Sequence, residues 1–369
     1  MKNNKSALKV NKGVEKPPMI NASAIKKINK KKAESKNVDY YVNGILKNDR
    51  AILAKAITLI ESSLKSHREI ANGILEACIP YSGKSIRIGI TGVPGVGKST
   101  FIEAFGTQLT NLGHKVAILA IDPSSSRTKG SILGDKTRME NLSNDKNAYI
   151  RPSPAAGSLG GVARTTYETI ILCECAGYDI IIIETVGVGQ SEIEAHSMVD
   201  FFLLLMLSGA GDELQGIKRG IIEMSDAIII NKADGENIAA AARAMAEYKN
   251  ALHLFPPTSS EWIPRTGTCS SIDGNGIIEV WKMINDYVEL TNKNGFFQEN
   301  RKHQEIKRFH NHIKSYLINN FYSDKNILQK INDYEQLIES HQIDVYTAAN
   351  SIINQNFSLI DKNEKSNSK

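Results

Sequence analysis

Residues 92–100 combine glycines, a lysine and hydroxyl side chains in a spacing that suits phosphate binding. Residues 92–99 fit the phosphate-loop pattern G-x-x-x-x-G-K-[ST] at every fixed position. A polyphosphate needs many donors in a small volume, and glycines let successive backbone N–H groups turn toward it. We expect Lys98 to reach the outer phosphates and Ser99 to offer a hydroxyl to Mg²⁺. The candidate loop residues are Gly92, Val93, Pro94, Gly95, Val96, Gly97, Lys98, Ser99 and Thr100.

Residues 231–234, Asn-Lys-Ala-Asp, could choose the base of a nucleotide. The Asp234 carboxylate can accept from guanine N1–H and the 2-amino group together, whereas adenine presents no such pair of donors. Lys232 would pack along the base, and Asn231 would hold the loop. The tetrapeptide alone occurs by chance, but after a phosphate loop and at a strand end it predicts GTP rather than ATP. Main-chain N–H groups behind the base are expected from Cys269, Ser270 and Ser271.

A second set of residues could hold the metal ion and sense the last phosphate. Glu184 opens Glu-Thr-Val-Gly, which is similar to the D-x-x-G element of GTPases with Glu in place of Asp. Glu184 can hold Mg²⁺ through a water, and the Gly187 N–H can meet the γ-phosphate. Asp122 and Asp135 could approach the metal or the attacking water; Asp122 is better placed because it directly ends a strand, and Asp135 could equally be a surface charge. The candidate catalytic residues are Lys98, Asp122 and Glu184, and the candidate metal ligands are Ser99, Asp122, Asp135 and Glu184.

The residue after Gly187 bears on the rate of hydrolysis. In Ras-like enzymes a glutamine there orients the attacking water. Here that position is Val188, and Gln190 lies two residues further on. We therefore expect slow hydrolysis that a partner or a second copy of the chain accelerates. The glycine-rich, charged stretch 209–220 is interpreted as a nucleotide-responsive segment rather than a plain loop.

The elements that must position these motifs are short apolar runs. Between residues 85 and about 285, strands alternate with helices, which predicts an α/β fold with a mostly parallel central sheet covered on both faces. Ligands of such sheets lie beyond the carboxyl ends of the strands, and each motif directly follows a strand. After the lead-in strand that ends at the phosphate loop, the predicted strands are 115–121, 179–183, 201–207, 227–230 and 266–271.

Helical spacing of apolar residues flanks the sheet region on both sides. We expect two or three helices over 39–78 and further helices from 285 to 360. The C-terminal helices could cover the core or form a dimerisation arm, and the sequence leaves both open. The predicted divisions are a disordered basic leader 1–38, an N-terminal helical extension 39–84, a GTPase domain 85–285, a C-terminal helical dimerisation arm 286–360 and a disordered tail 361–369.

Composition excludes several classes of protein. The net charge is +5, but residues 1–38 hold eleven lysines against two acids, so we expect no nucleic-acid partner. The longest apolar run, 201–207, is too short to span a membrane. The N-terminus has no apolar segment of signal-peptide length, which favours the cytoplasm. Four scattered cysteines indicate reduced thiols rather than a zinc site or disulfides.

Over about residues 39–287 the chain resembles the MeaB-type GTPases, the chaperones of adenosylcobalamin-dependent methylmalonyl-CoA mutase, also described as arginine/ornithine transport kinases (ArgK family). The motifs that carry the resemblance are 92–100, 122–125, 184–192, 211–220 and 231–234. It implies the SIMIBI class of P-loop GTPase, a homodimer held largely by the C-terminal arm, GTP or GDP as ligand and Mg²⁺ as cofactor. It also implies gated delivery of adenosylcobalamin to the mutase and ejection of damaged cofactor. The implied switch residues are Gln190, Asp212, Glu213, Gln215 and Lys218.

Other functions remain open at this point. A kinase of a periplasmic amino-acid transport protein would need an acceptor site with a base beside it, and no spare group of residues suggests one. A metallochaperone GTPase normally has His- or Cys-rich stretches, whereas the eight histidines here are dispersed. The MeaB-type family usually has Ala where this chain has Ser271, a change that main-chain contacts to the base would survive. We do not expect cobalamin to contact this chain.

Overall fold

The computed structural model describes residues 37–62, 64–121, 139–151, 159–185, 190–209, 219–256 and 258–354. Side chains at 159–161, 190 and 219 are likewise outside the description. Most of the predicted leader and all of the predicted tail lie outside these ranges. The predicted domain boundaries therefore stay predictions, and the one after residue 285 falls inside a continuous helix, α13 (Ile277–Lys293).

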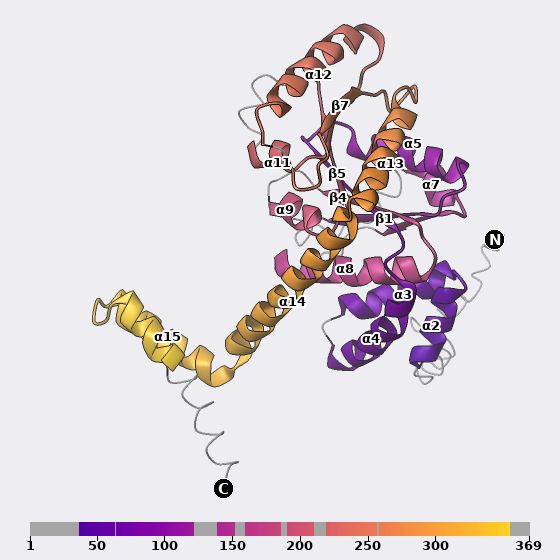
Figure 1. Cartoon of the computed structure of the whole chain (residues 1–369). Coiled ribbons are helices and arrows are strands. Elements are labelled where there is room, and N and C mark those ends of the chain that lie inside the picture. Colours follow the sequence, from indigo (N-terminus) through magenta and orange to yellow (C-terminus); the bar gives the residue numbers. More distant parts are fainter. Residues whose placement is uncertain are drawn as a thin grey trace, which may run out of the picture.

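A seven-stranded sheet forms the centre of the described chain (Figure 1). Its strand order is β3-β2-β4-β1-β5-β6-β7, and all neighbouring strands pair in parallel. The predicted parallel α/β sheet is thus confirmed, with β1 at its centre between β4 and β5. The strands are β1 (Ile86–Gly92), β2 (Val116–Ile121), β3 (Ala148–Arg151), β4 (Ile180–Thr185), β5 (Phe201–Met206), β6 (Ala227–Ile230) and β7 (Arg265–Thr268).

The strands β4, β5 and β6 are almost entirely apolar and buried, because both faces of the sheet are covered there. Along β4, Ile180 and Ile182 join the core on one face, while Ile181 and Ile183 join the core on the other. Period-two alternation thus supplies two separate cores from one apolar run. The edge strand β3 was not predicted from the sequence, because it has only four residues and no long apolar run announces it.

Helices cover each face of this sheet. On one face, α5 and α13 pack together, and Phe105 meets Trp281 at a ring distance of 6.3 Å. On the other face, α8 separates the sheet from α2, α3 and α4 (Figure 1). The α-helices are α2 (Val38–Leu46), α3 (Arg50–Glu61), α4 (Lys65–Cys78), α5 (Lys98–Asn111), α7 (Glu140–Asn144), α8 (Leu159–Cys175), α9 (Gln190–His196), α11 (Arg219–Glu223), α12 (Ile238–Leu252), α13, α14 (Phe296–Ser323) and α15 (Lys325–Glu339), and the 3-10 helices are η1 (Ile79–Tyr81) and η3 (Gly235–Asn237).

The N-terminal extension contains three α-helices, within the two or three that the sequence predicted. Asn37 caps α2 by accepting from the Tyr40 N–H, and Asp49 caps α3 by accepting from two backbone N–H groups. Ile45, Ile57 and Ile74, one from each helix, are fully buried in the core shared with α8. The extension is therefore part of the folded body.

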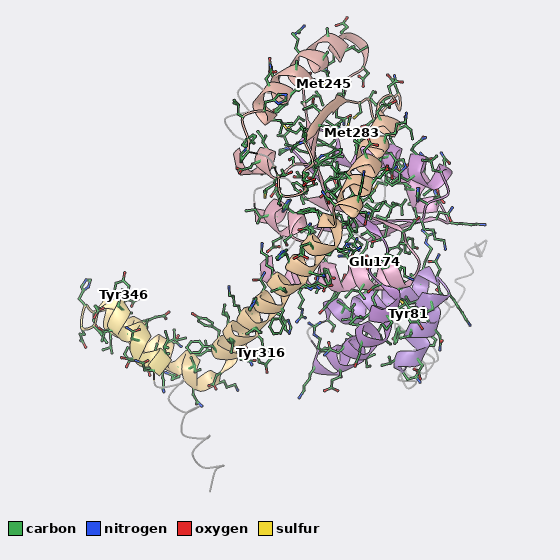
Figure 2. All side chains as sticks on the ribbon, viewed as in Figure 1. Tyr81, Glu174, Met245, Met283, Tyr316 and Tyr346 are labelled. Atoms are coloured by element: carbon green, nitrogen blue, oxygen red, sulfur yellow. The ribbon has the colours of Figure 1, made fainter. Side chains whose placement is uncertain are left out.

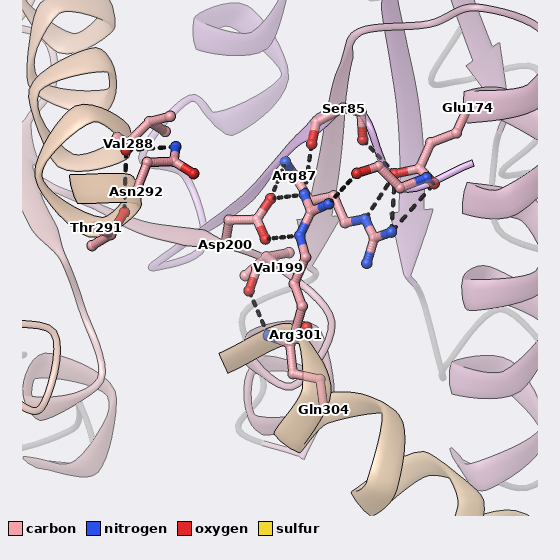
Figure 3. Close-up of polar contacts among 11 residues, drawn as sticks. Ser85, Arg87, Glu174, Val199, Asp200, Val288, Thr291, Asn292, Arg301 and Gln304 are labelled. Atoms are coloured by element: carbon pink, nitrogen blue, oxygen red, sulfur yellow. Dashed lines mark hydrogen bonds and ion pairs between the residues drawn. The ribbon is translucent and has the colours of Figure 1, made fainter. Parts of the chain in front are cut away.

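A buried charge network fixes the first turns of α14 to the sheet (Figure 3). The Arg301 guanidinium donates to both carboxylate oxygens of Asp200, at 2.8 and 2.6 Å, and to the carbonyls of Gly83 and Ser85. Gln304 donates to the Val199 carbonyl at 2.8 Å. Since every guanidinium nitrogen of Arg301 has an acceptor, its burial is compensated.

Beyond this anchor, α14 and α15 leave the body and expose apolar side chains (Figure 1). The apolar side chains along this part of α14 do not cover the core of this chain: Ile306 is 57% exposed, Phe309 62% and Tyr316 61%. Tyr316 and Tyr346, labelled in Figure 2, lie along this arm and are both exposed. Residues 345–354 form a further helical segment at its end.

The four cysteines are buried and free, as expected for reduced thiols. Cys78 and Cys175 are hydrogen-bonded, and this bond together with burial raises the pKa of Cys78. In the part of the chain that the structure describes, no helix is both long enough and apolar enough to cross a membrane.

Candidate nucleotide-binding site

The phosphate loop joins the central strand β1 to α5 and needs glycine at two positions for different reasons. A Cβ at Gly92 would lie 2.4 Å from the Leu205 carbonyl of the neighbouring strand, so any side chain would clash with backbone. Gly97 has a φ of +90°, a left-handed conformation that glycine adopts without strain. The loop therefore fits tightly against β5 and turns sharply into the amino end of α5, which carries partial positive charge.

Lys98 lies inside the curve of its own loop. Its ammonium donates to the Gly92 carbonyl at 2.9 Å, so it is held where the loop's backbone converges. Burial lowers the pKa of Lys98, and the carboxylates of Glu184 and Glu192 oppose that shift. A partly buried cation beside a helix amino end is well suited to meet a polyphosphate.

Ser99 and Glu184 come from different elements and meet beside the loop. The Ser99 hydroxyl donates to Glu184 Oε1 at 3.2 Å, across from α5 to β4. Hydroxyl and carboxylate oxygens are the ligand types that Mg²⁺ prefers, so these two residues fit the ion. Next to Glu184 in β4, the Thr185 hydroxyl donates to Thr91 Oγ1 of β1 at 2.8 Å and so links the two strands.

Glu192 is a residue near this site to which the sequence analysis gave no role. It is fully buried on α9, and its charge acts on Lys98. Ser191, also buried, donates to Glu192 Oε2 at 3.1 Å. The signal that could have found it was its place at the end of the motif 184–192. A buried acid whose charge raises the pKa of the phosphate-loop lysine makes Glu192 a further candidate site residue.

Residues 231–234, which are expected to bind the base, are here called the base loop. Two of its side chains hold it directly against the phosphate loop. Asn231 Nδ2 donates to the Val96 carbonyl at 2.9 Å, and Lys232 Nζ donates to the Gly95 carbonyl at 2.8 Å. Asn231 is buried, and Lys232 has a left-handed backbone with a φ of +59°. Motifs more than 130 residues apart are thus joined by side chain to carbonyl bonds.

The loop after β7 completes the arrangement. The Ser270 hydroxyl donates to Asp234 Oδ2 at 2.7 Å, and the Ser271 hydroxyl donates to Asn231 Oδ1 at 2.8 Å. The Cys269 thiol donates to the same Asn231 oxygen at 3.4 Å. The three residues therefore reach residues 231–234 with their side chains. The expected main-chain N–H contacts to the base stay a prediction. The Ser271 hydroxyl makes a bond that an alanine at this position could not make.

The remaining candidate residues cannot be placed. Among the described ranges, no group of three or more His, Cys, Asp or Glu is arranged to hold a metal, and those ranges exclude two of the predicted ligands. The candidates outside the described residues are Asp122, Asp135, Gly187, Asp212, Glu213, Gln215 and Lys218, and the Gln190 side chain is also outside them.

A cavity of about 320 Å³ lies beside the base loops, between β6, β7 and the first turns of α13. Its lining includes Ala233, Cys269 and Ser270 together with Met283, but not Asn231, Lys232 or Asp234. The cavity therefore borders the candidate site on the side of α13. We place the nucleotide where the motif side chains converge and not in this cavity.

Comparisons with known proteins agree with this geometry. The sequence profile of the family described as methylmalonyl Co-A mutase-associated GTPase MeaB matches residues 53–326. The Escherichia coli protein named GTPase ArgK is 45% identical over 284 residues, covering 77% of this chain and 86% of that protein. The mouse protein named methylmalonic aciduria type A homolog, mitochondrial, is 45% identical over 330 residues, covering 87% and 80%.

A solved structure gives the same result for the fold. The crystal structure of a protein named LAO/AO transport system kinase superposes with a TM-score of 0.69 at 35% identity, covering 85% of this chain and 96% of that one. The family profile spans most of the chain, and both relatives match more than two thirds of it. This chain therefore belongs to the methylmalonyl-CoA mutase-associated GTPase family, MeaB, and is a P-loop GTPase.

Proposed function

We propose that this GTPase is a chaperone that gates adenosylcobalamin loading and protection of methylmalonyl-CoA mutase. The family's name associates it with that mutase, and relatives at 42–45% identity are named methylmalonic aciduria type A homologs. The observation that carries the proposal is the joining of a phosphate loop and a base loop into one site by Asn231 and Lys232. Such a site lets one protein surface differ between the GTP and GDP states.

In the nucleotide site, each residue has a proposed task. The phosphate-loop amides and Lys98 bind the phosphates, and Asp234 accepts from the guanine edge. Ser99 and Glu184 hold Mg²⁺, which supplies charge neutralisation at the β- and γ-phosphates when bound. The buried Glu192 carboxylate favours the charged form of Lys98. Asp122, Asp135 and Gly187 are proposed to join them on sequence grounds alone.

Hydrolysis by the isolated chain is proposed to be slow. Val188 stands where a water-orienting glutamine would be, and a valine side chain can neither accept nor donate a hydrogen bond. A partner, or a second copy of this chain, then completes the site. Residues Gln190, Asp212, Glu213, Gln215 and Lys218 are proposed to respond to the nucleotide. Slow, gated hydrolysis suits a checkpoint better than a metabolic catalyst.

The exposed face of α14 and α15 is proposed to bind a second copy of the chain. It continues from a rigidly anchored first turn, and its side chains Phe309, Ile313 and Tyr316 are 62%, 40% and 61% exposed. An unpartnered apolar face of this kind marks an interface. Analytical ultracentrifugation of the full chain should show a dimer, and Phe309→Ser with Tyr316→Ser should shift it to monomer. A parent chain that sediments as a monomer at micromolar concentration would contradict the arm's role.

The experiment that tests the mutase role is co-purification with defined nucleotides. Immobilised full-length chain is loaded with GDP or with a non-hydrolysable GTP analogue, and purified methylmalonyl-CoA mutase is passed over it. Retention that depends on the nucleotide supports the proposal. Lys98→Ala serves as the matched control, because it should lose the nucleotide dependence while keeping the fold. Equal retention in all states, or none, would overturn it.

A second candidate is a kinase of a periplasmic amino-acid transport protein, because the solved relative at 35% identity is named a transport system kinase. That reaction transfers the γ-phosphate to a protein side chain, whereas a GTPase transfers it to water. Incubation with GTP labelled at the γ-phosphate distinguishes them: label in free phosphate supports hydrolysis, and label on an acceptor protein supports the kinase. The cytoplasmic location stays a prediction.

A further inference from the structure

Asn237 lies just beyond the base loop and bonds to it twice. Its side-chain Nδ2 donates to the Lys232 carbonyl at 2.6 Å, and its backbone N–H donates to the Asp234 carbonyl at 2.9 Å. Asn237 ends η3 and directly precedes α12, so both bonds are made from the rigid start of a helix. The loop is thus held at Lys232 and at Asp234 by one residue.

The first of these bonds supports an unusual backbone conformation. Lys232 has a φ of +59°, which residues other than glycine rarely adopt and which persists only where the surroundings enforce it. This conformation sends the Lys232 ammonium back to the Gly95 carbonyl while the chain continues to Asp234. Without the Asn237 amide, the Lys232 carbonyl would lose its donor and the turn could relax.

A third bond connects Asn237, and through it this loop, to the central sheet. The Ser208 hydroxyl donates to Asn237 Oδ1 at 2.6 Å, and Ser208 follows β5 by two residues. Strand β5 pairs with β1 up to Gly92, the first residue of the phosphate loop. The Asn237 side-chain amide therefore links the turn before Asp234 to the residue that follows β5. Its nitrogen donates to the turn, and its oxygen accepts from Ser208.

We propose that Asn237 is a positioning residue for guanine recognition, which sets where the Asp234 carboxylate meets the N1–H and 2-amino group of the base. It does not touch the nucleotide; it acts through the Lys232 turn and is itself oriented by Ser208. This proposal rests on the proposed guanine site at Asp234. The ligand class it serves is guanosine nucleotides as distinct from inosine nucleotides, which lack the 2-amino group.

The test measures discrimination rather than affinity alone. Dissociation constants of GDP and IDP are determined by calorimetry for the full chain with Mg²⁺. The parent should bind GDP about tenfold or more tightly than IDP, the factor expected for one hydrogen bond to a charged acceptor. Asn237→Ala should lower the ratio of the IDP dissociation constant to the GDP dissociation constant several-fold, because a displaced Asp234 carboxylate bonds less well to the 2-amino group.

Three further variants separate positioning from general damage. Asn237→Asp keeps the acceptor for Ser208 but turns an oxygen toward the Lys232 carbonyl, so it should lower the ratio as far as Asn237→Ala. Ser208→Ala keeps the bond to Lys232 and should lower the ratio less. Asn292→Ala is the matched control, because Asn292 also donates to a main-chain carbonyl, that of Val288 at 2.8 Å, but within α13 (Figure 3). It should leave the ratio unchanged.

The outcomes distinguish two failures. If the parent does not prefer GDP over IDP, the proposed guanine site is wrong. If the parent discriminates and both Asn237 variants keep the parent's ratio, the positioning role is wrong while the guanine site stands. Should Asn237→Ala fail to fold, Asn237→Asp and Ser208→Ala decide the question in the same assay.

Discussion

Asn231 and Val96 join the two recognition loops, since the Asn231 amide donates to the Val96 carbonyl at 2.9 Å. The Asn231 oxygen meanwhile accepts from Ser271 and Cys269, so both ends of one buried amide are used. A base loop and a phosphate loop that share an amide cannot move independently. We infer that base recognition and phosphate binding are coupled in this chain.

Asn231→Asp tests this coupling. The substitution keeps an oxygen for Ser271 but places a second oxygen against the Val96 carbonyl, which removes a donor and adds repulsion. We expect GDP affinity to fall by roughly ten- to a hundredfold, the range for losing a bond and burying an unsatisfied carbonyl. Because the phosphate loop is displaced, pyrophosphate should also compete less well with GDP for the site. Unchanged pyrophosphate competition would contradict coupling through this bond.

Lys98→Ala should weaken nucleotide binding. The substitution removes a partly buried ammonium whose bonds to phosphate are charge-assisted, so the affinity for GDP should fall by roughly ten- to a hundredfold. Calorimetry with Mg²⁺ measures it. Lys55→Ala, on the exposed side of α3, is the control and should bind like the parent. If Lys98→Ala also binds normally, the phosphate site lies elsewhere.

Glu184→Gln should alter the Mg²⁺ requirement. The variant keeps the shape and the acceptor for Ser99 but removes the negative charge that attracts the ion. The Mg²⁺ concentration for half-maximal hydrolysis should rise about tenfold, as for the loss of one charge-assisted contact, while GDP binding without Mg²⁺ stays near that of the parent. Glu247→Gln, exposed on α12, should change neither. A Glu184 variant with the parent's Mg²⁺ dependence would exclude a role at the metal.

Arg301→Met should strongly destabilise the fold. It would leave the Asp200 carboxylate, whose side chain is 2% exposed, buried without its partner. Breaking a buried pair in this way costs about 3–5 kcal/mol. Arg265→Met is the matched control, because its pair with Asp286 is about half exposed and contributes about 1 kcal/mol or less.

Thermal denaturation of the two arginine variants gives the comparison. The double variant Arg301→Met with Asp200→Asn should recover part of the loss, since the unpaired charge is then removed. Equal loss of melting temperature in the Arg301 and Arg265 variants would show that the network of Figure 3 does not stabilise the anchor of α14.

Asp226 should make stability depend on pH. Burial raises its pKa from 3.8 to about 7, although its carboxylate accepts from the Phe202 N–H. Because the folded pKa is raised, the folded state binds more protons than the unfolded state, and stability should fall as the pH rises from about 4 to about 7. Asp226→Asn should flatten that slope in urea unfolding. A slope that persists in the variant would assign the pH dependence to another group.

The sequence by itself determined the parallel sheet, the helical extensions and the family. These follow from local patterns: apolar runs of strand length, helical spacing, and motifs whose residues are adjacent in the chain. The structure confirmed the sheet and the three N-terminal helices, and the comparisons confirmed the family. The nucleotide roles of individual residues stay proposals.

Only the tertiary structure decided which distant side chains meet. Arg301 is one of several charged residues in α14, and nothing local in the sequence indicates that it pairs with Asp200, which lies 101 residues away. The partners of Asn237 and the burial of Glu192 were hidden for the same reason. The exposed stripe on α14 has the same periodicity as a buried one, because periodicity records that a face is apolar but not what covers it. Long-range contacts depend on how the elements pack, and that information is spread over the whole chain.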